Sequence, residues 1–278
     1  MMPSLAAVET GKKLALANKE SLVIAGKQII EAADRNGAAI LPVDSEHSAI
    51  FQSLVGEVSP ARRLILTASG GPFLHTPKER LCEVTVEQAL RHPNWSMGAK
   101  ITVDSSTMVN KGFEVIEAHW LFGLPAEKID VLVHPQSVVH SMVEFADGAI
   151  KAQLGTPDMR LPIQYAFSFP KRLSLNGDRL DLFRQPLEFF EPDTEKFRCL
   201  AMAYEAISKG GNMPCILNAA NEIVNEGFRN GACSFLEMGE IIEKTMSKVS
   251  FDKSPDLDVY LQTDAESRKV AQELMSGR

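Results

Sequence analysis

The stretch LALANKESLVIAGKQIIEAADRNGAAILPV, residues 14–43, decides the fold class. LALA (14–17) has the composition of a strand, VIAGKQIIEAADRNG (23–37) has helical spacing that ends at Gly37, and AAILPV (38–43) is typical of a short buried strand. A strand–helix–strand order favours parallel pairing, in which ligands bind at the loops that follow the carboxyl ends of the strands. The sequence therefore predicts an α/β fold.

Short apolar runs alternate with turns from residue 44 to about residue 168. Strands are predicted at RRLILTAS (62–69), KITVDSS (100–106) and DVLVHP (130–135). VVHSMVEF and AIKAQL are predicted to form a hairpin, because a short loop that contains Gly148 joins them. This middle region is therefore expected to be a mixed α/β (α+β) domain.

The last part of the sequence is predicted to be helical. Residues 169–194 are rich in Pro, Asp and Arg and predict an extended linker. From residue 195 to 278, four stretches have helical spacing and end near Gly or a basic residue, as helix C-termini prefer: FRCLAMAYEAISKGG, CILNAANEIVNEGFRNG, EMGEIIEKTMSKV and AESRKVAQELM. The predicted division is 1–43, 44–168, 169–194 and a C-terminal helical bundle at 195–278.

Composition and charge exclude several classes of protein. The 278 residues are 45% hydrophobic and 23% charged, which excludes a disordered, collagen-like or coiled-coil chain. The net charge of −7, with no basic face, argues against nucleic acid as a partner. No apolar run approaches the roughly 18–20 residues of a membrane-spanning helix, and the first residues lack the features of a secretory signal. We therefore expect a cytoplasmic protein with no membrane partner, whose four cysteines are free thiols.

Asp44 and Glu46 follow the predicted strand 38–43. In extended backbone, residues two apart point the same way, so both carboxylates could face one site with Ser45 opposite. Two carboxylates repel unless one is protonated or a divalent cation bridges them, and ligation by oxygen alone favours Mg²⁺ or Mn²⁺. The alternative is an exposed acidic turn, which the triplet taken alone favours.

Two segments have the residues of a phosphate site. Ser69-Gly70-Gly71-Pro72 would let backbone N–H groups approach an anion, although it is also a common turn composition. The segment 104–111 combines hydroxyls, an amide and an ammonium before a helix, which suits a phosphate, with simple helix capping as the alternative. These segments predict an anion site whose ligand stays open.

Two further features could complete such a site. Glu114 and Glu117 lie on one helical face with Lys111, so Glu114 could supply a third carboxylate to the metal, unless these are surface charge pairs. The loop 92–98 places Trp95 between turn-forming residues and could be either a lid that excludes water or a packed turn. The chain has no G-x-G-x-x-G, Walker A, G-x-S-x-G or H-E-x-x-H motif. The residues alone thus predict a metal site beside a phosphate site and leave the reaction open.

Seven strings together resemble the 1-deoxy-D-xylulose 5-phosphate reductoisomerase family, in the order and spacing of that family. They are ALANKESLV (15–23), PVDSEHSAIFQ (42–52), ASGGPF (68–73), RHPNWSMGAKITVDSSTMVNKGFEVIEAHWLF (91–122), HPQSVVHSMV (134–143), QLGTPDMR (153–160) and LNAANEIV (217–224). Family members begin with a Rossmann-like NADPH-binding domain. The resemblance implies that 1–43 is a remnant of that domain and that 44–168 is the catalytic domain.

The resemblance also implies a role for particular residues. Asp44, Glu46 and Glu114 match the metal ligands of the family. The residues that match its substrate contacts are Lys19, Ser45, Glu46, Ser69, His92, Trp95, Ser105, Asn110, Lys111 and Glu114. Those that match its NADPH contacts are Asn18, Glu20, Gly98 and Met159. Lys19, Glu46, His92 and Glu114 are implied to be catalytic.

The implied activity is the NADPH-dependent rearrangement and reduction of 1-deoxy-D-xylulose 5-phosphate to 2-C-methyl-D-erythritol 4-phosphate, a step of non-mevalonate isoprenoid biosynthesis. NADPH and Mn²⁺ or Mg²⁺ are the implied cofactors, and a homodimer is the implied assembly. For this chain alone, which lacks most of the NADPH-binding domain, we expect binding of metal and sugar phosphate without turnover. The alternatives are a non-catalytic dimer that binds metal and sugar phosphate, and a metal-dependent sugar-phosphate aldolase or phosphatase.

Overall fold

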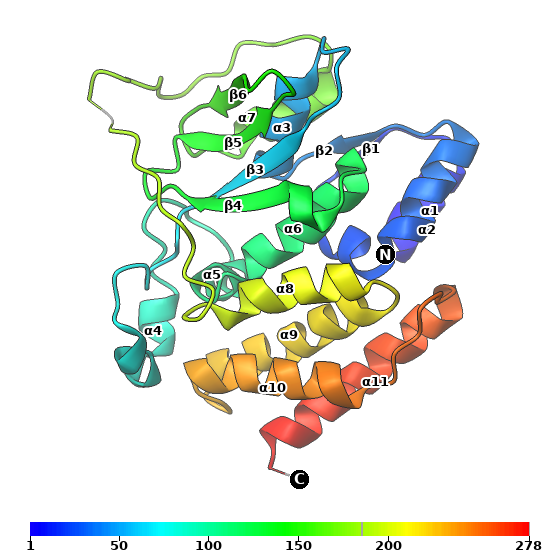
Figure 1. Ribbon diagram of the computed structural model, residues 1–278, viewed down its shortest axis with the longest axis vertical. Coiled ribbons are helices and arrows are strands. Elements are labelled where there is room, and N and C mark those ends of the chain that lie inside the picture. The colour runs from blue at the N-terminus through cyan, green and yellow to red at the C-terminus, as the bar shows by residue number, and fades with distance from the viewer. Residues whose placement is uncertain (185, 278) are drawn as a thin grey trace. The chain divides into compact units, whose positions relative to one another are not determined.

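The computed structural model describes residues 1–184 and 186–277 (Figure 1). The chain divides into two units. Unit 1 comprises Met1–Leu22, Gly26–Ser69 and Glu117–Pro192, and unit 2 comprises Val23–Ala25, Gly70–Ile116 and Asp193–Arg278. Neither unit is one continuous stretch of chain. The four-part division based on the sequence stays a prediction.

Unit 1 begins with the predicted strand–helix–strand element. Strands β1 (Leu14–Leu16) and β2 (Ile40–Pro42) pair in parallel, as expected, after helix α1 (Met2–Glu9) and on either side of α2 (Glu20–Asn36). Gly37 ends α2 in a left-handed conformation with φ 62°, which glycine adopts without steric cost. Parallel pairing brings the residues that follow β1 and β2 to the same edge of this small sheet.

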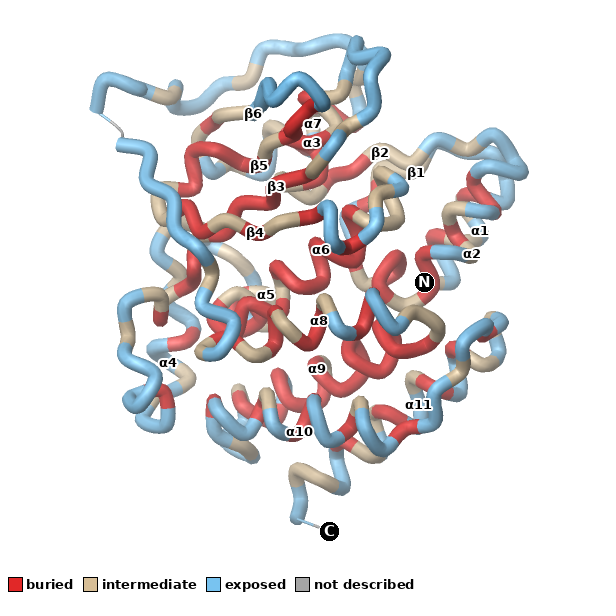
Figure 2. Tube along the Cα trace, in the orientation of Figure 1, coloured by how far each residue is buried: buried red, intermediate tan, exposed pale blue. Residues whose placement is uncertain are grey.

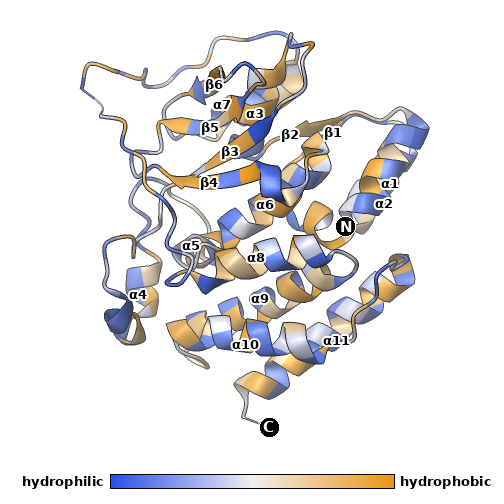
Figure 3. Cartoon of the chain, in the orientation of Figure 1, coloured by the Kyte–Doolittle hydropathy of each residue, from blue (hydrophilic) through white to orange (hydrophobic). Residues whose placement is uncertain are grey.

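A second sheet in unit 1 has the strand order β4-β3-β5-β6. Its strands are β3 (Arg63–Ala68), β4 (Ile129–Val133), β5 (Val139–Glu144) and β6 (Ile150–Leu154). Strand β3 is parallel to β4 and antiparallel to β5, and β5 and β6 form the predicted hairpin. Figure 3 shows β3 changing from hydrophilic at its start to hydrophobic, in agreement with its burial after Arg63.

Unit 1 also contains three helical segments, one irregular segment and the end of α6 (Val109–Phe122). The three helical segments are α3 (Ser45–Leu54), η2 (Ala126–Lys128) and α7 (Arg160–Ser168), and α3 packs on β5 and β6. Residues 169–184 and 186–192 form no helix or strand, apart from an isolated bridge between Phe190 and Val133. The Nδ1 atom of buried His134 lies 2.8 Å from the carbonyl oxygen of Glu188, so this irregular segment is tied to the end of β4.

Unit 2 is helical. It contains η1 (Lys78–Glu83), α4 (Val86–Ala89), α5 (Ala99–Ser106) and the first two turns of α6 (Val109–Phe122), which continues into unit 1. The predicted C-terminal bundle is confirmed as α8 (Arg198–Lys209), α9 (Met213–Arg229), α10 (Phe235–Lys248) and α11 (Leu257–Met275). Helix α9 packs against the other three and is buried along most of its length (Figure 2).

The prediction of a strand at KITVDSS was wrong, because residues 99–106 form helix α5. The buried positions Thr102, Val103, Asp104 and Ser106 do not alternate along the chain, because three of them are consecutive. The Oγ1 atom of Thr102 donates to the carbonyl oxygen of Gly98 at 2.9 Å, so a β-branched residue supports the first turn. Packing in unit 2 overrides a weak strand preference here.

Within the described ranges, no helix combines the length and the apolar character that crossing a membrane requires.

Candidate functional site

Asp44 and Glu46 stand at the start of α3, directly after β2. The expectation that they occupy extended backbone was wrong, because Asp44 is the N-cap of α3 and Ser45 and Glu46 lie in its first turn. The Oδ1 atom of Asp44 accepts from the backbone N–H of Glu46 at 3.3 Å, as an N-cap does. The Oγ atom of Ser45 donates to Oε2 of Glu46 at 2.6 Å. The capping bond explains why the chain turns here, while both carboxylates stay at the end of the strand.

Lys19 forms an ion pair with the carboxylate of Asp44. It follows β1 as Asp44 follows β2, and its Nζ atom lies 2.6 Å from Oδ2 of Asp44. Burial raises the pKa of Asp44, but Lys19 and His47 lower it more, so its pKa is held well below the usual range. Asp44 is therefore an anion at neutral pH.

His47 links Asp44 to Glu117 within unit 1. Its Nδ1 atom lies 3.3 Å from Oδ1 of Asp44 and 3.3 Å from Oε2 of Glu117, and both His47 and Glu117 are buried. Ligand-type atoms of these three residues lie within 4.8 Å of one another and could hold a metal ion. Sequence reasoning did not single out His47. Its position three residues after Asp44 on one helical face was the available signal.

Glu114 lies on α6 one turn before Glu117, in the part of that helix that belongs to unit 2. The Nδ2 atom of Asn110 donates to its Oε1 atom at 2.6 Å, and Lys111 forms an ion pair with its Oε2 atom. Lys111 is 5% exposed and Glu114 is 1% exposed. The alternative of a surface charge pair therefore does not hold for these residues.

Gly71 from one predicted phosphate segment and Ser105 from the other come close together in unit 2. Gly71 has φ 66°, and a Cβ atom added to it would lie 2.8 Å from the carbonyl oxygen of Ser105. Met108, in the turn between α5 and α6, adopts φ 59°, which is rare for a residue other than glycine. Close approach at Gly71 and the tight turn at Met108 fix the backbone around Ser105. Ser69, two residues before Gly71, directly follows β3.

His92 organises its own loop in unit 2. Its Nδ1 atom accepts from the backbone N–H groups of Asn94 and Trp95, at 3.2 and 3.0 Å. In the neutral ring these bonds place the proton on Nε2. Burial lowers the pKa of His92 to about 4, so the ring is neutral at pH 7 and Nε2–H is a donor. The hypothesis that the loop acts as a lid stays a prediction.

The four predicted cofactor residues lie on different elements. In unit 1, the Nδ2 atom of Asn18 donates to Oε2 of Glu20 at 2.7 Å, and Met159 is the N-cap of α7 with 38% exposure. In unit 2, Gly98 is the N-cap of α5, and a Cβ atom added there would meet nothing within 4 Å. Open space at Gly98 is compatible with a ligand that approaches the backbone closely.

Comparisons with known proteins match the same kind of enzyme in successive parts of the chain. Residues 40–122 match a model of the 1-deoxy-D-xylulose 5-phosphate reductoisomerase C-terminal domain, 154–270 match a model of the DXP reductoisomerase C-terminal domain, and 1–26 match a model of 1-deoxy-D-xylulose 5-phosphate reductoisomerase. The curated enzyme of that name from Bacteroides fragilis is 59% identical over 277 residues. The enzyme from Porphyromonas gingivalis is 51% identical over 275 residues. In both comparisons the match covers 99% of this chain and 71% of the relative.

Solved structures give the same result. The Zymomonas mobilis reductoisomerase in complex with NADPH has a TM-score of 0.91 and 46% identity, over 99% of this chain and 72% of that one. A DOX-P reductoisomerase in complex with NADPH, fosmidomycin and magnesium has a TM-score of 0.90 and 41% identity, over 98% of this chain and 72% of that one. At 59% identity over nearly its whole length, this chain belongs to the 1-deoxy-D-xylulose 5-phosphate reductoisomerase family of enzymes.

Proposed function

We propose that this chain carries the metal-binding and sugar-phosphate-binding residues for the NADPH-dependent conversion of 1-deoxy-D-xylulose 5-phosphate to 2-C-methyl-D-erythritol 4-phosphate. The observation that carries the proposal is the group of buried Lys19 with half-buried Asp44 and Glu46 at the carboxyl ends of β1 and β2. In parallel sheets ligands bind at this edge. Relatives that are 51–59% identical bear the name of the enzyme for this reaction.

The metal ligands in this proposal are Asp44, Glu46 and Glu114. Their donor atoms are all carboxylate oxygens, which suit Mg²⁺ or Mn²⁺. Helix α6 is continuous from Glu114 to Glu117, and Glu117 contacts His47, one residue after Glu46. Glu114 therefore lies on the same face of α6 as Glu117, one turn earlier. When bound, the cation would polarise the substrate carbonyl and stabilise negative charge on its oxygen.

The phosphate of the substrate is assigned to Ser69, Ser105, Asn110 and Lys111. Lys111 supplies a buried ammonium and Ser105 supplies a hydroxyl. The absence of a side chain at Gly71 lets its backbone lie close to that of Ser105. Contacts to a phosphate that does not react can orient the sugar and so lower the barrier to the rearrangement. Because the phosphate group lies away from the reacting carbons, these residues bind and position the substrate.

The hydroxy-ketone end is assigned to Lys19 and Ser45, and His92 is assigned a further contact with the substrate. Lys19 brings positive charge next to Asp44 and can stabilise negative charge that develops on a substrate oxygen. The Nε2–H group of His92 can donate to a hydroxyl at neutral pH, because the ring stays uncharged. Trp95, whose backbone N–H donates to Nδ1 of His92, is assigned to covering the site and excluding water.

NADPH is assigned to Asn18, Glu20, Gly98 and Met159. When bound, it would supply the hydride that reduces the rearranged aldehyde. Asn18 and Glu20 offer an amide and a carboxylate next to the Lys19 site, and Met159 offers an exposed apolar face. A solved relative that is 46% identical was determined in complex with NADPH.

Calorimetric titration with 1-deoxy-D-xylulose 5-phosphate, with and without Mn²⁺, tests the proposal. We expect binding that depends on the metal, because Mn²⁺ relieves the repulsion between the carboxylates and adds ligation for the sugar oxygens. Absence of binding under both conditions would contradict the site assignment.

The same sample, incubated with NADPH and Mn²⁺, separates the alternative activities. Oxidation of NADPH would contradict our expectation that these 278 residues bind without turnover. Release of inorganic phosphate would indicate a phosphatase, and cleavage of the carbon skeleton would indicate an aldolase. Binding without any product is the result that we expect of this chain, and the binding-module alternative predicts the same result.

We also propose that the chain forms a homodimer. Strand β6 pairs with β5 on one side only in the described sheet, and Ile150 at its start is 52% exposed. Such an edge can be covered by a second copy across a two-fold axis. Sedimentation equilibrium should give twice the mass of one chain. A single-chain mass at micromolar concentration would contradict this proposal.

A further inference from the structure

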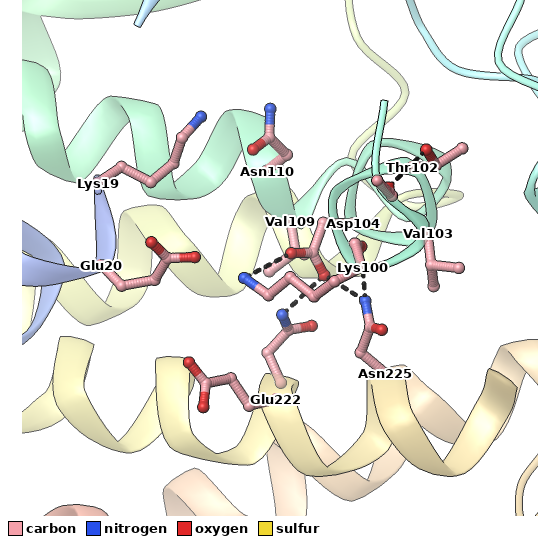
Figure 4. A network of polar contacts seen from close by, with 12 residues as sticks. Lys19, Glu20, Lys100, Thr102, Val103, Asp104, Val109, Asn110, Glu222 and Asn225 are labelled. Carbon is pink, nitrogen blue, oxygen red and sulfur yellow. Dashed lines mark hydrogen bonds and ion pairs between the residues drawn. The ribbon is translucent and has the colours of Figure 1, made fainter. Parts of the chain in front are cut away.

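A buried carboxylate in unit 2, Asp104, has no role in the site described above. It lies in the last turn of α5 and is 1% exposed. Its Oδ1 atom accepts from the Nδ2 atom of Asn221 at 2.8 Å. Oδ1 also accepts from the Nδ2 atom of Asn225 at 2.7 Å, and Oδ2 lies 2.9 Å from Nζ of Lys100 (Figure 4). A charge taken out of water needs such partners, so the two asparagines hold Asp104 in one place.

Both asparagines belong to the string LNAANEIVN on α9. They are one helical turn apart, so their side chains leave α9 on the same face. Asn225 does more than hold the carboxylate, because its Nδ2 atom also donates to the carbonyl oxygen of Lys100 at 2.9 Å. Its Oδ1 atom accepts from Nε of Arg229 at 2.8 Å. Helix α9 thus holds α5 at two points, one turn apart.

Asp104, which α9 holds, is next in the chain to a residue of the proposed phosphate site. Asp104 precedes Ser105, and only the short turn around Met108 separates α5 from Asn110 and Lys111 at the start of α6. On its other side, the backbone of Ser105 lies close to Gly71. A Cβ atom added to Gly71 would lie 2.8 Å from the carbonyl oxygen of Ser105. A shift of α5 would therefore move Ser105, because the backbone has little room to compensate.

We propose that Asn221 and Asn225, acting through Asp104, are positioning residues that set the geometry of the phosphate-binding group Ser105, Asn110 and Lys111. This inference rests on the proposed function, since it takes these three residues to bind phosphate. It gives the C-terminal helical domain a part in substrate recognition. A misplacement of about 1 Å is enough to weaken hydrogen bonds to a phosphate substantially.

The test replaces Asn221 with leucine, which has the same branching at Cγ and cannot donate a hydrogen bond. The affinity of the chain for 1-deoxy-D-xylulose 5-phosphate in Mn²⁺ should fall about tenfold, which corresponds to about 1.4 kcal/mol. The affinity for unphosphorylated 1-deoxy-D-xylulose should change less than about twofold, because only the phosphate group is misplaced. If Asn221 had a purely structural role, its replacement would lower the affinity for both ligands alike.

The matched control is Asn218→Leu. Asn218 lies on α9 one turn before Asn221 and is also fully buried, but its side-chain atoms have no hydrogen-bond partner among the described residues. This variant should bind both sugars within about twofold of the parent chain. Should Asn221→Leu fail to fold, Asn221→Ser leaves a side chain too short to reach Asp104 and should give the same selective loss.

The outcomes separate this inference from the function on which it rests. Equal losses for the two sugars in the Asn221 variant, or equal effects of the Asn218 and Asn221 variants, would overturn the positioning role. Failure of the parent chain itself to bind the sugar phosphate would overturn the proposed function instead. Tenfold selective loss in the Asn221 variant alone would support both.

Discussion

Replacing Glu114 with glutamine should weaken Mn²⁺ binding on the order of 100-fold, while the chain keeps its fold. The substitution removes one of three proposed carboxylate ligands and its negative charge, and even supporting residues around metal ligands are worth about 10–100-fold in affinity. Glutamine keeps the size of Glu114, and its side-chain oxygen can still accept from Asn110. Mn²⁺ affinity measured by titration calorimetry, with circular dichroism for the fold, checks this expectation.

Glu117→Gln is the matched control for this experiment. Glu117 lies on the same helix one turn later, is equally buried and contacts His47. It belongs to the other group of ligand-type residues, Asp44, His47 and Glu117. If Mn²⁺ binding depends on Glu117 and not on Glu114, the metal site is the one with a histidine. Unchanged Mn²⁺ affinity in the Glu114 variant would contradict the three-carboxylate site.

Deleting residues 195–278 should cause the remaining chain to aggregate. Within unit 2, α9 packs on α5 and α10 packs on η1, and the Phe73 and Phe235 rings lie 5.1 Å apart. A Cβ atom added to Gly112 on α6 would lie 2.5 Å from that of Ala203 on α8, so these helices are in close contact. The deletion removes all of these partners at once.

The expected loss of stability is as large as the whole stability of a typical domain. Leu81, Val103, Val109 and Phe113 are fully buried in unit 2. Exposing four such side chains costs about 6–12 kcal/mol at 1.5–3 kcal/mol each, which is comparable with the whole stability of a typical domain. Asp104 would also lose Asn221 and Asn225. Light scattering checks aggregation, with the chain shortened only to residue 275 as control. A monodisperse 1–194 fragment that binds Mn²⁺ would contradict this expectation.

The local sequence pattern was sufficient to predict the type of those helices and strands whose hydrophobic periodicity is strong. The strand–helix–strand element at 14–43, the hairpin with Gly148 and the four C-terminal helices all have the predicted type. In each case the hydrophobic spacing extends over several residues, and a glycine or a turn marks the end. KITVDSS failed because a run of seven residues with three β-branched side chains fits a helix as well as a strand.

The sequence by itself determined the family and the fold class, and it supplied most of the residues that we propose for the site, because strings such as PVDSEHSAIFQ hold those residues close together along the chain. Only the tertiary structure decided that Asp44 caps a helix, that His47 reaches Glu117, and that α9 holds Asp104. These contacts join residues up to 121 positions apart. Spacing along the chain specifies which residues share a face, whereas the partner of that face depends on how the whole chain packs.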